Sequence, residues 1–361
     1  MNRIDVDRKT AVITLDNVLT SASNEELFSL TRALDTGLPK ILVLDFGCVE
    51  LLDNTGINVL VKLHAYARKT HSRILVTGLN DLYKNVFAVS GLNEGFHICI
   101  AEEDIIRAGN IKDSQSMRML SGLLTKVDSQ KIDGAECWAK PVDNLIVEGM
   151  SDKGINLNVH GRRTVGPIQG FGQLWEKTYV IDLSDTKLKP EQIISTLKQR
   201  FPEFQPPKNR FFPSPRGIEP GEVVLINAST PGGLVATGIV VLYVGKDTFT
   251  FITPQGHPEA GWVTFRSFEE HGRIILQIQG MARASDPVYE IAFRMAGSTL
   301  QRQIWTHVLE SFARHTGSNE GVQFNAQCLD RSLQWSRLFN VFLNAQITSM
   351  LYNISHPARE K

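Results

Sequence analysis

Between residues 222 and 284, five segments with strand-like patterning follow one another with only short turns between them. They are rich in valine, isoleucine, threonine and phenylalanine, which are residues that strands favour. The connections GKDT, QGHPEAG and EEHG have the length of hairpin loops, which join antiparallel neighbours. The pattern therefore predicts an antiparallel meander. The segments are residues 222–228, 236–245, 248–254, 261–268 and 273–284.

A long helical pattern follows the meander at roughly residues 286–315, where apolar residues recur at helical intervals. Ahead of the meander, residues 174–183 alternate as a strand does, and Pro190 stands at the start of a helix. A curved antiparallel sheet beside one long helix cannot close completely. An apolar cavity between the sheet and the helix is therefore the expected binding site.

This order of elements resembles the START-like helix-grip superfamily, which includes plant allergens, lipid transfer domains and polyketide cyclases. Residues 248–268, TFTFITPQGHPEAGWVTFRSF, with residues 273–287, RIILQIQGMARASDP, look like an uncharacterised bacterial and plant family of that superfamily. That family carries a similar G-H-P-E-x-G hairpin. The resemblance implies a domain that binds an apolar small molecule or a lipid.

Two polar residues stand out on the hairpin loop. His257 and Glu259 flank Pro258, and an extended backbone would point both to the same side. An imidazole beside a carboxylate is a candidate acid–base pair, while the simpler interpretation is a solvated hairpin tip. The sequence has no nucleophile elbow, carboxylate dyad or metal motif, which weakens an enzymatic interpretation. The predicted ligand-binding residues are His257, Glu259, Trp262, Arg210 and Arg283.

Residues 11–107 are organised differently, because strand patterns there alternate with helical ones. The nearly continuous apolar runs at residues 41–46 and 73–78 are typical of buried parallel strands. The helical spacing between the two runs indicates a crossover helix. Ser23 and Glu26 form a capping-box pattern, which predicts a further helix. This region is expected to fold as a mixed sheet with helices packed on it.

The turn Asp53-Asn54-Thr55-Gly56 precedes the crossover helix. The side chain of Asp53 or Asn54 can accept hydrogen bonds from the free amides at the helix start. Thr55 would then lie beside the positive end of the helix dipole, where a phosphate is electrostatically favoured. The simpler alternative is that Thr55 is merely part of the cap.

Residues 11 to about 107 resemble the STAS domain, the fold of bacterial anti-sigma factor antagonists. The resemblance is carried by ILVLDFGCVELLDNTGINVLVKLHAYAR, RILVTGL and NVFAVSGLNEGF, which begin at residues 41, 73 and 85. It implies that Thr55 is phosphorylated by a partner kinase, often also the anti-sigma factor, and that the phosphate breaks the complex. The predicted partner-binding residues are Asp53, Asn54, Gly56, Asn17 and Thr20.

Two positions depart from the STAS pattern. Residues 17–20 read NVLT where the family often has G-E-L-D, so Thr20 replaces the usual acid. Thr55 also stands where serine is more usual. A domain that serves only as an assembly surface, without phosphorylation, is therefore an alternative.

The composition limits the kinds of binding partner that the sequence supports. Lysine plus arginine equals aspartate plus glutamate, with 38 of each, so no net field favours nucleic acid or an anionic membrane. The four cysteines lie far apart without metal-ligand spacing, and we expect no metal and no cofactor. The first ten residues are polar and charged, and no apolar run reaches the roughly 20 residues that span a bilayer. A cytoplasmic protein is predicted.

The secondary-structure patterns of two further regions are weaker. Residues 110–165 are expected to form a linker with a short helix and strands near residues 144–150 and 154–160. Residues 324–356 predict an amphipathic helix that packs in a core or self-associates, giving a homodimer, rather than lying on a membrane, because its basic content is slight. The predicted domains are residues 1–109, 110–165, 166–318 and 319–361.

Together these patterns predict a cytoplasmic bacterial regulatory protein. Its first domain would switch protein partners through phosphorylation at Thr55, and its second would hold an apolar small molecule or lipid. Ligand occupancy would alter the availability of the first domain to its partner. The alternatives are a helix-grip enzyme, such as a cyclase or hydratase, tethered by a STAS module, and a scaffold that is not phosphorylated.

Overall fold

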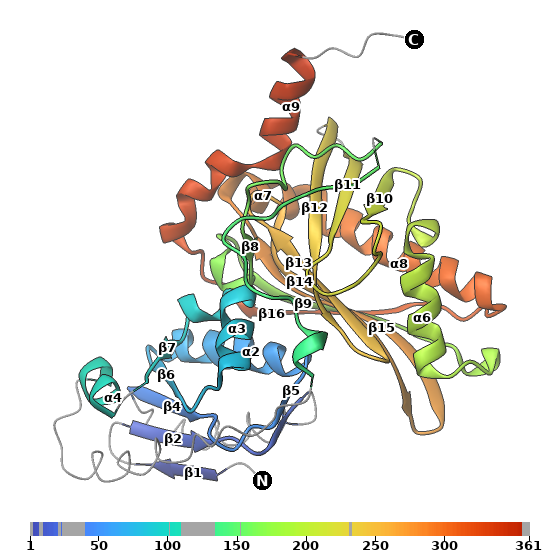
Figure 1. Ribbon diagram of the computed structural model, residues 1–361. Helices are drawn as coiled ribbons and strands as arrows, with labels where there is room; N and C mark the ends of the chain where they lie inside the picture. Colours follow the sequence, from blue (N-terminus) through green and yellow to red (C-terminus); the bar gives the residue numbers. More distant parts are fainter. Residues whose placement is uncertain are drawn as a thin grey trace. The chain divides into compact units, whose positions relative to one another are not determined.

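The computed structural model describes residues 3–6, 10–20, 23, 40–100, 102–109, 134–151, 153–230 and 233–355 (Figure 1). The chain divides into two compact units, Met1–Glu136 and Cys137–Lys361, and each is described by itself. The helix expected after Ser23 and the helix expected in the linker lie outside the described residues.

The described part of the first unit contains a five-stranded sheet in the order β1-β2-β4-β6-β7. Strand β1 is antiparallel to β2, and the other neighbouring pairs are parallel. The mixed sheet expected from the alternating pattern is therefore confirmed. Its strands are β1 (Arg3–Val6), β2 (Thr10–Thr14), β4 (Ile41–Asp45), β6 (Arg73–Thr77) and β7 (His97–Ile98).

Helices α2 (Gly56–Lys69), α3 (Asp81–Ser90) and α4 (Glu102–Gly109) accompany this sheet. All five residues of β4 are buried, as expected for a parallel strand covered on both faces. A short parallel pair, β3 (Val18–Leu19) and β5 (Leu51–Leu52), lies immediately before α2 in the fold. This small pair fixes the position of the turn that contains Thr55.

The second unit is built on a nine-stranded sheet among its described residues, in the order β10-β11-β12-β13-β14-β15-β9-β16 with β8 paired to β13. All neighbouring pairs are antiparallel, so the predicted meander is confirmed. The strands are β8 (Thr164–Val165), β9 (Leu174–Asp182), β10 (Asn209–Pro213), β11 (Val223–Thr230), β12 (Gly233–Val244), β13 (Thr248–Pro254), β14 (Glu259–Glu270), β15 (Arg273–Ala284) and β16 (Gln323–Asp330).

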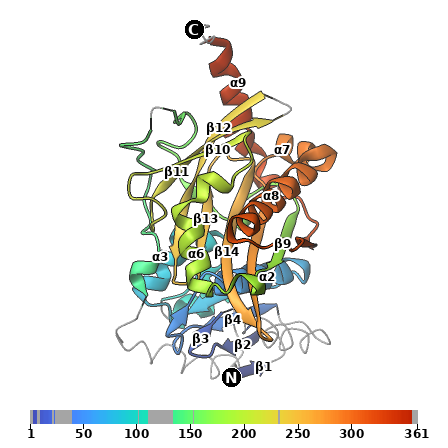
Figure 2. The same ribbon diagram turned by 90° about the vertical axis from the view of Figure 1, so that its right-hand side faces the viewer.

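Helices α6 (Pro190–Gln199) and α8 (Ser298–Thr316) lie on the same face of this sheet (Figure 2). The helix α7 (Pro287–Ala292) runs into α8 through a π-helical segment, η6 (Phe293–Gly297). The long helix predicted near residues 286–315 is thus confirmed, with an interruption that the periodicity did not indicate. The unit has the helix-grip arrangement of a sheet curved around a long helix.

Aromatic side chains fill much of the space between sheet and helices. The rings of Phe249 and Phe265 stack with centroids 4.6 Å apart, and Phe201 packs edge-on against Phe251 at 5.3 Å. Trp305 of α8 contacts Phe265 at 5.5 Å. Phenylalanine rings and Trp305 therefore fill this part of the space between the sheet and the helix, where an apolar cavity was expected.

Two predictions of secondary structure are wrong. Residues 144–150 and 154–160 form no strand, and backbone bonds such as Leu145 N–H to Arg162 O (2.8 Å) hold them as irregular chain. Residues 323–330, expected to be helical, form β16, because their alternating pattern pairs with the open edge of β9. Helix begins only afterwards, as the 3₁₀ segment η7 (Trp335–Leu343) and α9 (Ala345–Ser355).

Candidate functional site

In the first unit, the carboxylate of Asp53 organises the turn before α2. Its Oδ1 accepts hydrogen bonds from the backbone N–H of Thr55 (2.9 Å), the Thr55 hydroxyl (2.7 Å) and the N–H of Gly56 (2.8 Å). Asp53 therefore supplies the negative charge at the positive end of α2. Asn54, the other residue considered for this role, is fully buried.

Thr55 itself is buried, with an exposed fraction of 5%. A methyl group added to Gly56 would lie 2.2 Å from the carbonyl oxygen of Leu19 and 2.7 Å from Leu52 Cδ1. The turn is therefore tightly packed against β3 and β5. A kinase can reach the Thr55 hydroxyl only if this turn opens, which the sequence pattern did not indicate.

The surface beside the turn combines polar and apolar groups. Asn17 is exposed, and its carbonyl oxygen accepts hydrogen bonds from the N–H groups of Glu50 (2.8 Å) and Leu51 (2.9 Å). Val18 and Leu51, from neighbouring strands, expose large apolar side chains. Thr20 is half-buried, and its N–H donates to Ser23 Oγ at 3.3 Å. The exposed members of this group form the part of the turn region that a protein partner can touch without any opening.

In the second unit, His257 and Glu259 are neighbours, but their side chains take separate roles. The backbone N–H of Glu259 donates to His257 Nδ1 at 3.1 Å, whereas both Glu259 carboxylate oxygens accept from Gln301 Nε2, at 2.9 and 2.7 Å. Burial lowers the pKa of His257 to about 4, so the imidazole is neutral at pH 7.

A polar cluster on the face toward α8 is formed by Glu259, Gln301, Lys177 and Tyr179. The Lys177 ammonium donates to Gln301 Oε1, so Gln301 bridges the lysine and the carboxylate. Burial raises the pKa of Glu259, and the charge of Lys177 and the hydrogen bond from Gln301 oppose that rise. Within the described residues, the Tyr179 hydroxyl is buried and has no hydrogen-bond partner.

The sheet leaves open space next to this cluster, at Gly280. The register places Gly280 opposite Lys177 on β9 and Val263 on β14, on the same face as the core residue Ile278. A methyl group added to Gly280 would meet only the Lys177 carbonyl oxygen, 4.0 Å away. Burial raises the pKa of the Tyr179 hydroxyl most. The charge of Glu259 raises it further, and the charge of Arg302 lowers it. Open space therefore remains beside Gly280, Lys177 and Tyr179, where the aromatic packing stops, and it is called the hollow below.

The other predicted ligand-binding residues lie away from this hollow. Alternation along β14, β15 and β10 puts Trp262, Arg283 and Arg210 on the opposite face of the sheet. Arg283 is buried there, in an ion pair with Asp330 (2.6 Å) and hydrogen bonds to the carbonyl oxygens of Gly172 (2.7 Å) and Ser332 (3.0 Å). These contacts tie β15 to the loop after β16.

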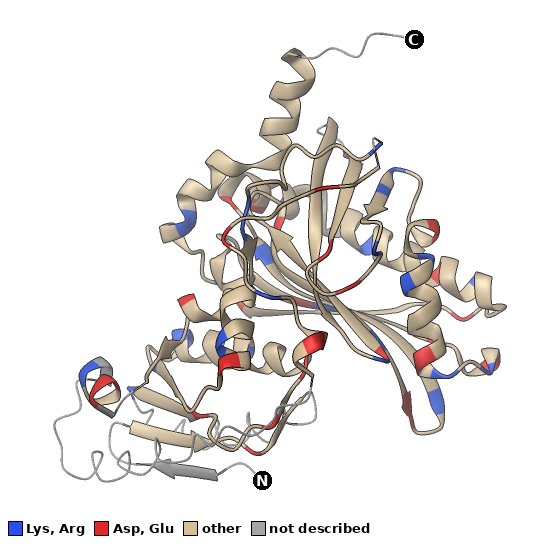
Figure 3. Cartoon of the chain, viewed as in Figure 1, with Lys and Arg blue, Asp and Glu red and all other residues tan. Residues whose placement is uncertain are grey.

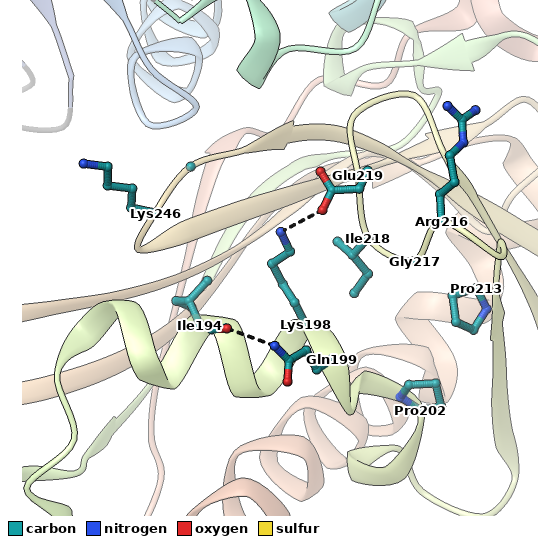
Figure 4. Close-up of a pocket in the computed structure, with 12 residues that line it drawn as sticks. Ile194, Lys198, Gln199, Pro202, Pro213, Arg216, Gly217, Ile218, Glu219 and Lys246 are labelled. Atoms are coloured by element: carbon teal, nitrogen blue, oxygen red, sulfur yellow. Dashed lines mark hydrogen bonds and ion pairs between the residues drawn. The ribbon is translucent and has the colours of Figure 1, made fainter.

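A second hollow, of about 420 Å³, lies on the outer side of α6 (Figure 4). Lys198 Nζ and Glu219 Oε1 face each other across it at 3.4 Å. Its remaining lining combines the buried Ile194 and Ile218 with glycine, proline and more exposed polar side chains, and it shares no residue with the polar cluster. Across the described ranges, no group of three or more histidine, cysteine, aspartate or glutamate side chains is placed to hold a metal ion.

The sequence analysis missed Lys177, Tyr179, Gln301 and Gly280 as site residues. The alternation of residues 174–183 puts Lys177 and Tyr179 on one face of β9, and that signal was available. Nothing local marks Gln301, because it reaches Lys177 across 124 residues of chain. Gly280 is recognisable as part of a site only once its neighbours across the sheet are known.

Comparison with known proteins identifies the family of the first unit. Residues 2–102 match the family model described as Mlab, STAS domain. The first unit is therefore a STAS domain, as its motifs and its strand order indicated. No curated protein sequence matches the chain.

Solved structures resemble each unit separately. The unphosphorylated anti-sigma factor antagonist SpoIIAA is 21% identical, with 31% of this chain and all of that chain covered and a TM-score of 0.28. The phosphorylated form of the Bacillus cell fate determinant SpoIIAA is also 21% identical, covering 30% of this chain and 99% of that chain, with a TM-score of 0.26. For the second unit, Ara h 8.0201 is 11% identical over 40% of this chain and 99% of that chain, with a TM-score of 0.31. Similarity at these levels says nothing about ligands or partners.

Proposed function

We propose that this chain is a cytoplasmic regulatory protein whose STAS unit exchanges protein partners through phosphorylation of Thr55. The supporting observation is the 2.7 Å hydrogen bond from the Thr55 hydroxyl to Asp53 Oδ1 at the N-terminus of α2. A hydroxyl held against a carboxylate is oriented, and a carboxylate can take up its proton as the oxygen attacks phosphorus. The exposed Asn17, Val18 and Leu51 beside the turn would form part of the partner surface.

The same geometry gives the phosphate a structural effect. A phosphate on Thr55 carries about −1.5 to −2 charges at neutral pH, and it would compete with Asp53 for the N–H groups of Thr55 and Gly56. Two anions repel each other at hydrogen-bonding distance, so Asp53 would leave the helix terminus. Phosphorylation would thus change both the charge and the shape of the surface that meets the partner.

The experiment is to incubate the full chain with ATP and an extract of its own host, and to locate phosphate by mass spectrometry. Thr55→Ala is compared with Thr70→Ala, because Thr70 ends the same helix and its hydroxyl also donates a hydrogen bond, in this case to the Tyr66 carbonyl oxygen at 3.1 Å. We expect phosphate on the native chain and on Thr70→Ala, and none on Thr55→Ala. Phosphate that persists in Thr55→Ala, or is absent from all three, contradicts the proposal.

For the second unit, we infer binding of a small amphiphilic molecule at the hollow beside Gly280. The buried Tyr179 hydroxyl without a partner supports this inference, because an unsatisfied buried donor costs about 1–3 kcal/mol unless something accepts its hydrogen bond. The ligand would carry an acceptor oxygen toward Tyr179 and an apolar part toward α8. His257 binds backbone rather than the Glu259 carboxylate, which favours a binding domain over the alternative of an acid–base enzyme.

Native mass spectrometry of the chain purified from its host tests ligand binding directly. Gly280→Phe should fill the hollow and abolish retention of the small molecule. Gly321→Phe is the matched control, because a side chain there also enters open space but outside the sheet. Retention by both variants would rule out this hollow. If the two units are coupled, the partner must bind with different affinities in the presence and absence of the molecule.

A further inference from the structure

The segment η7 is attached to the second unit by its polar side. Asn340 Nδ2 donates to the carbonyl oxygens of Gln169 (3.1 Å) and Ser285 (2.8 Å). At the end of η7, the fully buried Asn344 donates through Nδ2 to Asp286 Oδ2 at 2.8 Å. These bonds join η7 to the loop before β9 and to the start of α7.

The apolar side of η7 faces solvent, which reverses the usual amphipathic arrangement. Trp335, Phe339 and Phe342 have exposed fractions of 67%, 71% and 79%. The rings of Phe339 and Phe342 lie nearly parallel, with centroids 6.2 Å apart. Single exposed apolar residues are common, but aromatic residues gathered on one face while amides make the attachment indicate a surface that another body covers.

The helix α9 extends this apolar surface. Ser349 Oγ accepts from the N–H of Ala236 (3.1 Å) and fixes the first turns against β12. Beyond Ser349 every described residue is exposed, and Leu351 and Ile354 are among them. Both views show α9 projecting past the end of the sheet (Figures 1 and 2). Residues 350, 351, 352 and 354 point in directions about 100° apart per residue, so the helix end is apolar on more than one side.

The charged residues of this stretch are all positive, although the chain as a whole has no net charge. Arg331 and Arg337 are the charged residues between positions 331 and 355, and that stretch has no aspartate or glutamate. In the charge-coloured view, α9 carries neither red nor blue (Figure 3). The basic content is as slight as the sequence indicates, but within this stretch no carboxylate opposes the exposed Arg331. The exposure of the apolar side chains is what favours a membrane surface over the predicted packing in a core.

We propose that the outward face of η7 and α9, residues 335–354, docks on the headgroup region of an anionic lipid bilayer. Aromatic and aliphatic side chains flanked by arginine suit that interface. The end of α9 is apolar on more than one side, and the headgroup region can take up these side chains as the helix end sinks into it. In the described part of the chain, no helix has the length and apolar content needed to cross a bilayer.

The test is co-sedimentation of the full chain with vesicles of phosphatidylcholine alone and of phosphatidylcholine mixed with phosphatidylglycerol. We expect binding to the mixed vesicles that weakens as salt is raised. Phe339→Ser combined with Phe342→Ser should reduce it at least about tenfold, since each buried phenylalanine contributes strongly to transfer from water. The matched control is Val142→Ser combined with Ile146→Ser, a pair of exposed apolar residues elsewhere in the same unit, and it should bind as the native chain does.

Two results would overturn the proposal. One is the absence of native binding to both kinds of vesicle. The other is a dimer in sedimentation equilibrium that dissociates only in the Phe339→Ser, Phe342→Ser variant, which would assign the surface to a second copy of the chain. Thermal unfolding followed by circular dichroism checks that both double variants remain folded, as expected for changes at exposed positions.

Discussion

The turn before α2 is buried and the cluster beside Gly280 is half-buried, and these two polar sites differ in how completely their hydrogen bonds are made. At the turn, one carboxylate of Asp53 satisfies three donors within four consecutive residues, and no space is left at Gly56. Beside Gly280, three strands and a helix bring groups together from across the unit, and the Tyr179 hydroxyl is left without a partner. The first arrangement is closed at Gly56, whereas the second leaves open space at Gly280.

The largest expected effect comes from making the same substitution in both places. Gly56→Ala should destabilise the first unit by about 3 kcal/mol or more, because its methyl group would lie 2.2 Å from the Leu19 carbonyl oxygen. Gly280→Ala should change stability by less than about 0.5 kcal/mol, because its methyl group enters open space. Urea unfolding of the two variants measures both values. Equal losses would mean that the two sites are packed alike.

Acid should reveal the opposing titrations in the second unit. The pKa of His257 is about 4 in the folded chain and 6.5 when unfolded, so its contribution to stability is present above pH 6.5 and falls toward pH 4. The loss amounts to as much as roughly 3 kcal/mol. The pKa of Glu259 is raised, so its contribution is largest in acid and is lost as pH rises.

Single substitutions separate the two titrations. Glu259→Gln should steepen the fall in stability between pH 6.5 and 4, and His257→Asn should remove it. His271→Asn is the matched control, because His271 is an exposed hairpin residue with a left-handed backbone that asparagine tolerates. The measurement is the unfolding free energy of each variant across this pH range. Parallel curves for all three variants would show that neither buried group titrates as described.

Removing the carboxylate at the turn should have an intermediate effect. Asp53→Ala leaves the N–H groups of Thr55 and Gly56 without their acceptor, and we expect a loss of about 2 kcal/mol in unfolding free energy. Asp53→Asn keeps an acceptor oxygen and should lose less. The comparison is made by urea unfolding. A neutral outcome for Asp53→Ala would mean that another group caps α2, and the description of the turn as closed would fail.

The smallest effect is expected at the hydroxyl without a partner. Tyr179→Phe should leave stability unchanged or raise it by up to about 1 kcal/mol, because it removes a buried donor that nothing accepts. The same variant should lose affinity for any molecule that fills the hollow. Calorimetric unfolding and native mass spectrometry give the two readings. Marked destabilisation would show that the hydroxyl is bonded in solution.

The two sites also differ in how far the sequence predicts them. The turn lies within four consecutive residues, so its motif predicted the helix start and a cap by Asp53 or Asn54 without any knowledge of distant contacts. Burial of Thr55 was not predicted, because it depends on Leu19 and Leu52, which reach the turn only through pairing of β3 with β5. The meander was predicted because each hairpin is local.

The cluster beside Gly280 depends on contacts that no local pattern contains. Lys177 and Gln301 are 124 residues apart, and their meeting follows from how β9 and α8 cross. The prediction of a helix at residues 324–330 was wrong for a related reason. Phe324, Ala326 and Cys328 alternate weakly, and only the open edge of β9 makes that stretch a strand. Sequence patterns thus predicted elements better than they predicted which elements share an interface.

The π-helical segment η6 sets the rotational phase of α8. Ahead of it, the Tyr289 hydroxyl of α7 accepts from the N–H of Gln346 (2.9 Å), while beyond it Gln301 faces the sheet. A wide turn accommodates one residue more than an α-helical turn does. Deleting a single residue from Phe293–Gly297 would turn everything downstream by about 100°. Gln301 would then swing off Glu259 although no residue of the cluster had been altered.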